Sequence, residues 1–279
     1  MNTTVVTGDQ VVKQLIPRIT QRMEGLNFTP KLATLMVGDN PGIRSYFRSI
    51  KKVAQKYGIE VIELTWDLTD TETVQHTIEQ LNNDNDIGGI LIGEPLPKEI
   101  DRTALVETIS PTKDVDCMHP YNLGLLMAGR PRVLPSTVGS VWEILQFIGV
   151  PLTGKRAVII GRSLVVGKPL AMLLLQKGID ATVTVCHSKT EQLTDITREA
   201  DILIVAAGKP HLIGKEHVKR GTIVIDVGIN VVAGKLVGDV KFDEVYQLAS
   251  YITPVPGGVG KVTTHYLMYN LVKSYEHRR

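Results

Sequence analysis

A glycine-containing loop lies between a short apolar run and a helical stretch in the second half of the chain. The apolar run covers residues 156–160, the loop 161–168 and the helical pattern 169–177. Small residues let the backbone approach a pyrophosphate, and free N–H groups at the start of the helix attract that anion. We therefore predict a nucleotide loop in a parallel α/β sheet. A plain strand–helix turn is the alternative, because Ser163 and Gly167 depart from the Gly-x-Gly-x-x-Gly spacing.

The next strand indicates which nucleotide would bind. Residues 181–186 alternate β-branched side chains and predict the second parallel strand. In an NAD site this strand ends in an acidic residue that binds the ribose hydroxyls, whereas here His187 and Ser188 follow it. Arg162 offers a forked donor to a 2′-phosphate and Ser188 a hydroxyl, so NADP is the predicted cofactor. The alternative is a solvated Arg162 beside an ordinary turn.

Composition limits the class of partner. The chain has 279 residues and a net charge of +2 without a basic block, which favours a small-molecule partner over nucleic acid or a membrane surface. Cys117 and Cys186 lack metal-ligand or redox spacing and are expected to be free thiols. No metal site is predicted. No leader or membrane-spanning run is recognisable, so the expected location is the cytoplasm.

Helical and strand patterns alternate along the chain, as expected for the α/β class. The predicted helices are 11–23, 43–57, 71–82, 139–148 and 264–275, and the predicted strands are 31–37, 60–64 and 88–92, with four more near 156, 182, 202 and 222. We expect two α/β lobes with a ligand cleft between them, the second lobe a Rossmann-like parallel sheet. Residues 111–135 are expected to act as a linker, and the last helix to pack back on the first lobe.

The loop at 253–260 contains two prolines and three glycines. Such a loop suits close approach by a flat ligand, although a structural tight turn is the alternative. The loops at 38–41, 94–97 and 113–116 are expected to line the same cleft.

Several segments together resemble the bifunctional methylenetetrahydrofolate dehydrogenase/methenyltetrahydrofolate cyclohydrolase family, known in bacteria as FolD. They are Gly161-Arg162-Ser163 with Val166-Gly167, and residues 182–188, 225–230, 237–240 and 252–260. The resemblance covers essentially the whole chain. It implies a folate-binding catalytic domain at 1–135 and 262–279, an NADP-binding domain at 136–261, a homodimer, and a tetrahydrofolate one-carbon derivative as substrate.

The resemblance also implies roles for individual residues. NADP would contact Gly161, Arg162, Ser163, Gly167, Ser188 and Ile229. Folate would contact Tyr46, Asp116 and the loop Pro256, Gly257, Gly258, Val259 and Gly260, with Tyr46 and Asp116 as the catalytic pair. A turn-capping role is the alternative for Asp116.

The first lobe differs from the family at two residues that are expected to take part in the reaction. Ile50 occupies the position of the family's lysine and Gly93 that of its glutamine. Lys51 does not replace the lysine, because it would point about 100° away from the helix face of Tyr46. Hydride transfer depends mainly on positioning, whereas hydrolysis needs acid–base help that is typically worth about 10²–10⁴-fold.

We therefore expect NADP-dependent oxidation of 5,10-methylenetetrahydrofolate to 5,10-methenyltetrahydrofolate in one-carbon metabolism, with weak or absent cyclohydrolase activity. Three alternatives stay open. They are a relocated catalytic lysine at Lys261, a non-catalytic or regulatory paralogue, and a dehydrogenase for another small substrate, for which Gly93 and Glu94 would mark a changed pocket.

Overall fold

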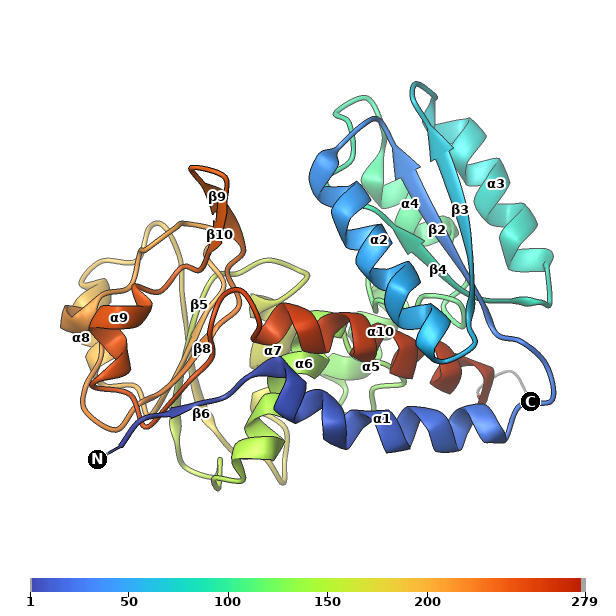
Figure 1. Cartoon of the computed structure of the whole chain (residues 1–279). Helices are drawn as coiled ribbons and strands as arrows, with labels where there is room; N and C mark the ends of the chain where they lie inside the picture. The colour runs from blue at the N-terminus through green and yellow to red at the C-terminus, as the bar shows by residue number, and fades with distance from the viewer. Residues whose placement is uncertain (1, 277–279) are drawn as a thin grey trace. The chain divides into compact units, whose positions relative to one another are not determined.

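A computed structural model describes residues 2–276 of the chain (Figure 1). Backbone contacts divide the chain into two compact units, which are treated separately. The six-stranded unit comprises the described residues of Met1–Gln14, Leu126–Arg130 and Thr137–Thr263. The three-stranded unit comprises those of Leu15–Leu125, Pro131–Ser136 and Thr264–Arg279.

The six-stranded unit is a parallel sheet in the order β1-β11-β8-β7-β5-β6. Its strands are β1 (Thr4–Val5), β5 (Arg156–Ile160), β6 (Thr182–Cys186), β7 (Ile202–Val205), β8 (Ile223–Asp226) and β11 (Tyr251–Ile252). The accompanying helices are α6 (Ser136–Ile148), α7 (Gly167–Leu174), α8 (Leu193–Arg198), α9 (Phe242–Tyr246) and the 3₁₀ turn η1 (Lys215–His217). An antiparallel hairpin is formed by β9 (Asn230–Val232) and β10 (Lys235–Val237).

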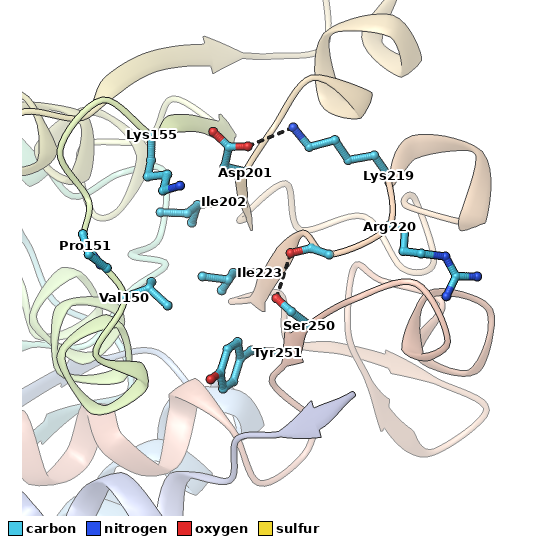
Figure 2. A pocket seen from close by; sticks show the side chains of 11 residues that line it. Val150, Pro151, Lys155, Asp201, Ile202, Lys219, Arg220, Ile223, Ser250 and Tyr251 are labelled. Atoms are coloured by element: carbon cyan, nitrogen blue, oxygen red, sulfur yellow. Dashed lines mark hydrogen bonds and ion pairs between the residues drawn. The ribbon is translucent and has the colours of Figure 1, made fainter. Parts of the chain in front are cut away.

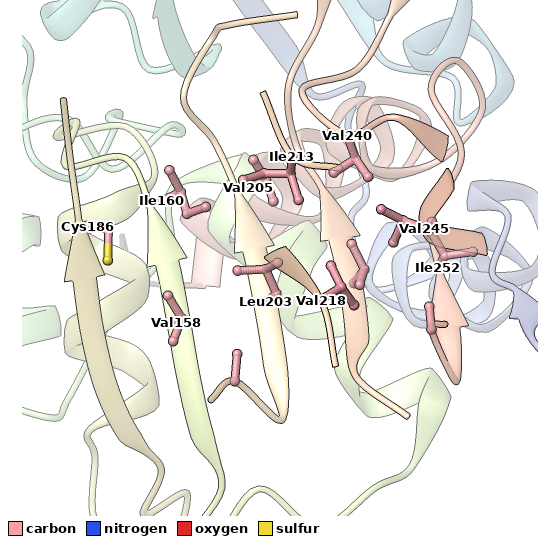
Figure 3. Packing of buried hydrophobic residues seen from close by; sticks show 13 residues of the cluster. Val158, Ile160, Cys186, Leu203, Val205, Ile213, Val218, Val240, Val245 and Ile252 are labelled. Carbon is pink, nitrogen blue, oxygen red and sulfur yellow. The ribbon is translucent and has the colours of Figure 1, made fainter. Parts of the chain in front are cut away.

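Branched aliphatic side chains explain why this sheet forms. Val158, Leu203, Val205 and Ile252 are buried in one cluster that extends across neighbouring strands (Figure 3). Strands covered on both faces are rich in Val, Ile and Leu, as these are, and such strands pair in parallel. The sheet places the carboxyl ends of β5, β7 and β8 in register, since Ile160 pairs with Val205 and Val205 with Asp226.

The three-stranded unit is also parallel, with β2 (Lys31–Val37) between β3 (Glu60–Trp66) and β4 (Ile87–Ile92). Its helices include α2 (Pro41–Lys56), α3 (Thr71–Asn83), α4 (Arg102–Thr108) and α5 (Pro120–Met127), the last of which ends just beyond the unit boundary. Helix α2 starts where Asn40 accepts a hydrogen bond from the N–H of Gly42 at 2.8 Å.

Two long helices belong partly to each unit, namely α1 (Gly8–Glu24) and α10 (Val259–Glu276). Within the three-stranded unit they pack together, because the guanidinium groups of Arg18 and Arg22 lie 4.8 and 4.9 Å from the ring centre of Tyr269. None of the helices in residues 2–276 is long and apolar enough to cross a membrane.

The α/β class and the parallel second sheet are confirmed. The structure differs from the prediction at 111–135, where the expected linker contains helix α5. It also differs at the N-terminus, which the interpretation grouped with residues up to 135. Residues 2–14 lie instead in the six-stranded unit, because Thr4 and Val5 pair with Tyr251 and Ile252 of β11.

Candidate cofactor and substrate sites

The nucleotide loop leaves β5 through a backbone turn that only glycine readily adopts. Gly161 has φ of +123° and donates its N–H to the carbonyl oxygen of Cys186 at 2.9 Å. At the other end of the loop, a Cβ built on Gly167 would collide with the carbonyl oxygen of Gly161. Both glycines are therefore required for the loop to close against the first turn of α7.

The loop presents unused backbone donors to solvent. The Ser163 side chain accepts the N–H of Val166 at 3.1 Å, and the Ser163 carbonyl accepts that of Lys168 at 3.1 Å. Within residues 2–276 no acceptor is found for the N–H groups of Leu164 and Val165. Donors of this kind beside a helix N-terminus fit the pyrophosphate of a dinucleotide.

The two predicted ribose-phosphate ligands lie at one edge of the sheet. Strands β5 and β6 end together, because Ile160 pairs with Cys186. Arg162 follows the first strand, Ser188 follows the second, and both are exposed. The turn at Ser188 is closed by the His187 N–H, which donates to Thr190 at 2.9 Å. The turn is thus ordinary in its geometry and also leaves Arg162 and Ser188 accessible to an anion.

The proline- and glycine-rich loop lies beside the cofactor edge. A Cβ on Gly260 would lie 3.3 Å from Cδ1 of Ile229, a predicted NADP contact that is 61% exposed. The loop is fixed by α1, since the Gly8 N–H donates to the Gly257 carbonyl at 2.7 Å. The Val255–Pro256 peptide is cis, and Gly257 has φ of +100°. The structure therefore brings together Ile229 and the predicted substrate loop of residues 256–260.

A buried carboxylate, which the sequence analysis missed, fixes the loops at this edge. Asp226 ends β8 and accepts backbone N–H groups from Gly228, Asp239 and Val240 at 2.9 to 3.1 Å. Burial raises the pKa of Asp226 to about 6, although these three donors act in the opposite direction. Asp226 followed by Gly228 was part of the family resemblance, but the sequence carried no signal for its hydrogen-bonding role.

In the three-stranded unit, Tyr46 of α2 and Asp116 interact electrostatically. Burial raises the pKa of the Tyr46 hydroxyl, and the carboxylate of Asp116 raises it further. Burial likewise raises the pKa of Asp116 to about 6, against the hydrogen bond that the Ser136 N–H donates at 3.0 Å. The two predicted catalytic residues are thus brought into one partly buried site, and the Ser136 bond is also what a turn-capping aspartate would make.

Position 50 is apolar in its surroundings as well as in its side chain. Ile50 is fully buried on the same face of α2 as Ile43 and Phe47. A Cβ on Gly93 would lie 2.6 Å from Cγ2 of Ile43 and 3.0 Å from Cζ of Phe47. Isoleucine and phenylalanine side chains therefore occupy the space into which a side chain at position 93 would extend.

Glu94, Cys117 and Lys261 each have a distinct local structural setting. Glu94 forms an ion pair with Arg102 at 2.8 Å, and its charge also raises the pKa of Asp116. Cys117 is buried with φ of +57°, a backbone region that favours glycine. Lys261 forms an ion pair with Asp9 at 2.6 Å, so its ammonium has a structural role at the start of α10.

A buried amide on α10 holds the backbone on either side of the Asp116 site. The Nδ2 atom of Asn270 donates to the carbonyl oxygens of Val115 and Leu134, each at 2.8 Å. These residues adjoin Asp116 and lie near its partner Ser136. This role cannot be predicted from the sequence, because one asparagine in a helical pattern has many possible partners. Among residues 2–276 no group of three or more His, Cys, Asp and Glu could hold a metal ion.

Comparison with known proteins identifies the family. Family models for the tetrahydrofolate dehydrogenase/cyclohydrolase catalytic domain and NAD(P)-binding domain match residues 6–116 and 135–279. A bifunctional protein FolD of Enterococcus faecalis is 45% identical, with 97% of this chain and 98% of that protein covered.

Two solved structures extend the comparison. The bifunctional FolD enzyme of Campylobacter jejuni has a TM-score of 0.94 at 40% identity, covering 99% of this chain and 100% of that one. The FolD of Trypanosoma brucei, complexed with NADP and an inhibitor, has a TM-score of 0.92 at 36% identity, covering 100% and 99%. The chain belongs to the tetrahydrofolate dehydrogenase/cyclohydrolase family.

Proposed function

We propose that this protein oxidises 5,10-methylenetetrahydrofolate to 5,10-methenyltetrahydrofolate with NADP, and that its cyclohydrolase activity is weak or absent. The observation that carries the first part is the glycine loop with unused N–H donors after β5, at the same end of the sheet as β8, which Ile229 and its contact with the 256–260 loop follow. The trypanosomal relative, which binds NADP, supports the choice of cofactor.

The residues of the six-stranded unit suit NADP in a specific way. The Leu164 and Val165 N–H groups would bind the pyrophosphate, while Arg162 and Ser188 would bind the 2′-phosphate. The bound dinucleotide supplies the hydride acceptor. Ile229 would pack against it, close to the loop that we expect to hold the folate.

The role of Asp116 is to bind the folate ring system. A carboxylate accepts hydrogen bonds from the N–H edge of a pterin, and a partly buried one does so more strongly than an exposed one. Tyr46 would complete this site with its ring and a hydroxyl that stays protonated, because both burial and Asp116 raise its pKa. These contacts position the one-carbon unit, and positioning is the main requirement of hydride transfer.

Loss of the hydrolytic step follows from the surroundings of Ile50. Hydrolysis of the methenyl bridge requires an activated water molecule and a group that moves protons. Ile50, Ile43 and Phe47 provide neither, and they fill the space beside Gly93. The related proteins are named bifunctional, so this chain would differ from them at one of two steps.

An absorbance time course tests both steps at once. Purified protein is mixed with 5,10-methylenetetrahydrofolate and NADP, and NADPH and the methenyl product are followed separately. We expect equal formation of both, with methenyl clearance no faster than without enzyme. The E. faecalis relative, assayed in parallel, should clear it. Clearance at the relative's rate would contradict the loss of cyclohydrolase, and absence of NADPH from folded, NADP-binding protein would contradict the dehydrogenase assignment.

Two substitutions at position 50 test whether the hydrolytic step lacks a proton-transfer group. Ile50→Lys is expected to restore part of the clearance, whereas Ile50→Met, which fills a similar volume without a proton-transfer group, is not. Because Ile43 and Phe47 occupy the space beside Gly93, Gly93→Gln should require their truncation to alanine before it adds to the Ile50→Lys rate. Equal clearance by the Met and Lys variants would show that a proton-transfer group at position 50 is not what is missing.

We also propose a homodimer. The β9–β10 hairpin exposes apolar side chains that a monomer would leave in water, among them Val231 at 70% and Leu236 at 47% exposure. These two residues are paired across the hairpin, which makes them one continuous apolar patch.

A further inference from the structure

A cavity of about 380 Å³ lies at the edge of the six-stranded sheet opposite to the nucleotide loop (Figure 2). Its lining residues precede or begin the strands, as Lys155 does for β5, Asp201 for β7 and Tyr251 for β11. The nucleotide loop, in contrast, follows the carboxyl end of β5. The cavity is therefore separated from the proposed NADP site by the length of the strands.

Apolar side chains form one part of the cavity wall. Ile202 and Ile223 are paired neighbours on β7 and β8, and they are 1% and 6% exposed. Val150 and Pro151 face them from the segment that follows α6 (Figure 2). Apolar side chains on two sides of a cavity suit an apolar ring between them, and the cavity volume lies near the lower end of the range for small-molecule pockets.

One end of the cavity carries an uncompensated positive charge. Asp201 is already bonded to the Lys219 ammonium at 2.9 Å and to the Arg156 N–H at 3.0 Å. These bonds lower the pKa of Asp201, the Arg156 N–H most strongly, and attraction from Lys155 also contributes. In the described part of the chain, the Lys155 ammonium has no hydrogen bond or ion pair of its own, and Figure 2 shows it directed toward Ile202.

We propose that this cavity binds a small planar anion, a single or fused ring that carries a carboxylate or phosphate group. The anionic group would pair with Lys155, and the ring would lie between Pro151 and the two isoleucines. Tyr251, at the opposite end of the cavity in Figure 2, adds an aromatic side chain to the lining. Arg220 points away from the cavity and would contribute only long-range attraction.

Methyl NMR of isoleucine-labelled protein, saturated with NADP, tests the proposal at the cavity itself. The probes are benzoate, phenyl phosphate, benzamide and acetate. We expect benzoate or phenyl phosphate to shift the Ile202 and Ile223 methyl signals in a saturable manner, and neutral benzamide and ring-free acetate to bind at least about tenfold more weakly. Tighter binding of phenyl phosphate assigns a phosphate ligand, and tighter binding of benzoate a carboxylate.

Two lysine variants identify the source of the charge. Lys155→Met should weaken binding of the anionic probe at least about tenfold. Lys177→Met, a matched change at an exposed position of the same unit outside the cavity, should leave it unchanged. NADP affinity, measured on both variants, reports that the unit is folded. The proposal is overturned if neither anion shifts the two methyl signals, if benzamide binds as tightly as benzoate, or if both variants lose affinity equally.

Discussion

A single methyl group at position 167 decides whether the nucleotide loop can close. In Gly167→Ala the new Cβ would collide with the Gly161 carbonyl and lie 3.0 Å from Cα of Arg162. We expect NADP affinity to fall more than about tenfold, because the loop must shift by more than rotamer adjustment allows. Titration with NADP measures this. Gly124→Ala is the control, since a Cβ at this position of helix α5 would have no atom within 4 Å. Unchanged NADP affinity in both variants would refute the role of Gly167.

The carboxylate of Asp116 should impose a pH dependence on the reaction. Its pKa is raised to about 6 by burial, so the carboxylate that we expect to bind folate is lost as the pH falls below 6. The kcat/KM for the folate substrate should then fall about tenfold per pH unit. Asp226 titrates in the same range, which makes Asp116→Asn the deciding variant. Its kcat/KM should be lower and nearly independent of pH from 5 to 8, whereas a retained acidic limb would assign the titration elsewhere.

Residues differ in how far their roles can be predicted from sequence. The burial of Ile50 follows from its spacing to Phe47 on one helix face, which sequence alone contains. The contact of Ile43 with position 93 does not, because it depends on how α2 packs on the end of β4. The hydrogen bonds of Asp226 likewise join residues thirteen and fourteen positions apart through a loop whose path no local pattern specifies.

Among the elements, α10 ties the Asp116 segment in place through Asn270. In Asn270→Ala two buried carbonyl oxygens, of Val115 and Leu134, lose their donor. We expect the free energy of unfolding to fall by no more than about 1–3 kcal/mol for each unpaired carbonyl group. The KM for folate should rise, while NADP affinity is unchanged. Ser274 lies on the same helix, and Ser274→Ala removes a buried hydroxyl that donates to the carbonyl oxygen of Gly88 on β4. It should lower stability without raising KM, and an equal rise in both variants would reduce Asn270 to a general stabilising residue.

Longer elements were predictable because their hydrophobic period is repeated. The strand at 31–37 was predicted with the bounds that the structure gives, and the helix at 71–82 falls one residue short. The two-residue strands β1 and β11 were missed, because pairing between distant segments, not a local pattern, defines them. The β9–β10 hairpin was also missed; its turn uses Ala233 and Gly234, both with positive φ, and alanine is an unusual residue there.

For the whole molecule, the division into two α/β units follows from the alternation of elements, but the assignment of the N-terminus does not. Residues 2–7 contain too few apolar positions to predict a strand, and their place is set by β11. The same limit applies to association between copies, since exposed apolar side chains on a hairpin become visible only after its strands are paired.

Association of two copies through this hairpin should be sensitive to a charge on its exposed apolar side chains. Val231→Glu would place a charge in the proposed interface, and burying an unpaired carboxylate costs several kcal/mol or prevents contact. We expect the variant to be monomeric at micromolar concentration by light scattering coupled to gel filtration. Val231→Thr retains the branched shape at Cβ, and it should be a dimer, as the wild type is expected to be. Because Val231 is 70% exposed, neither change should disturb the fold of a monomer, so a dimeric mass for the Glu variant would place the contact on another surface.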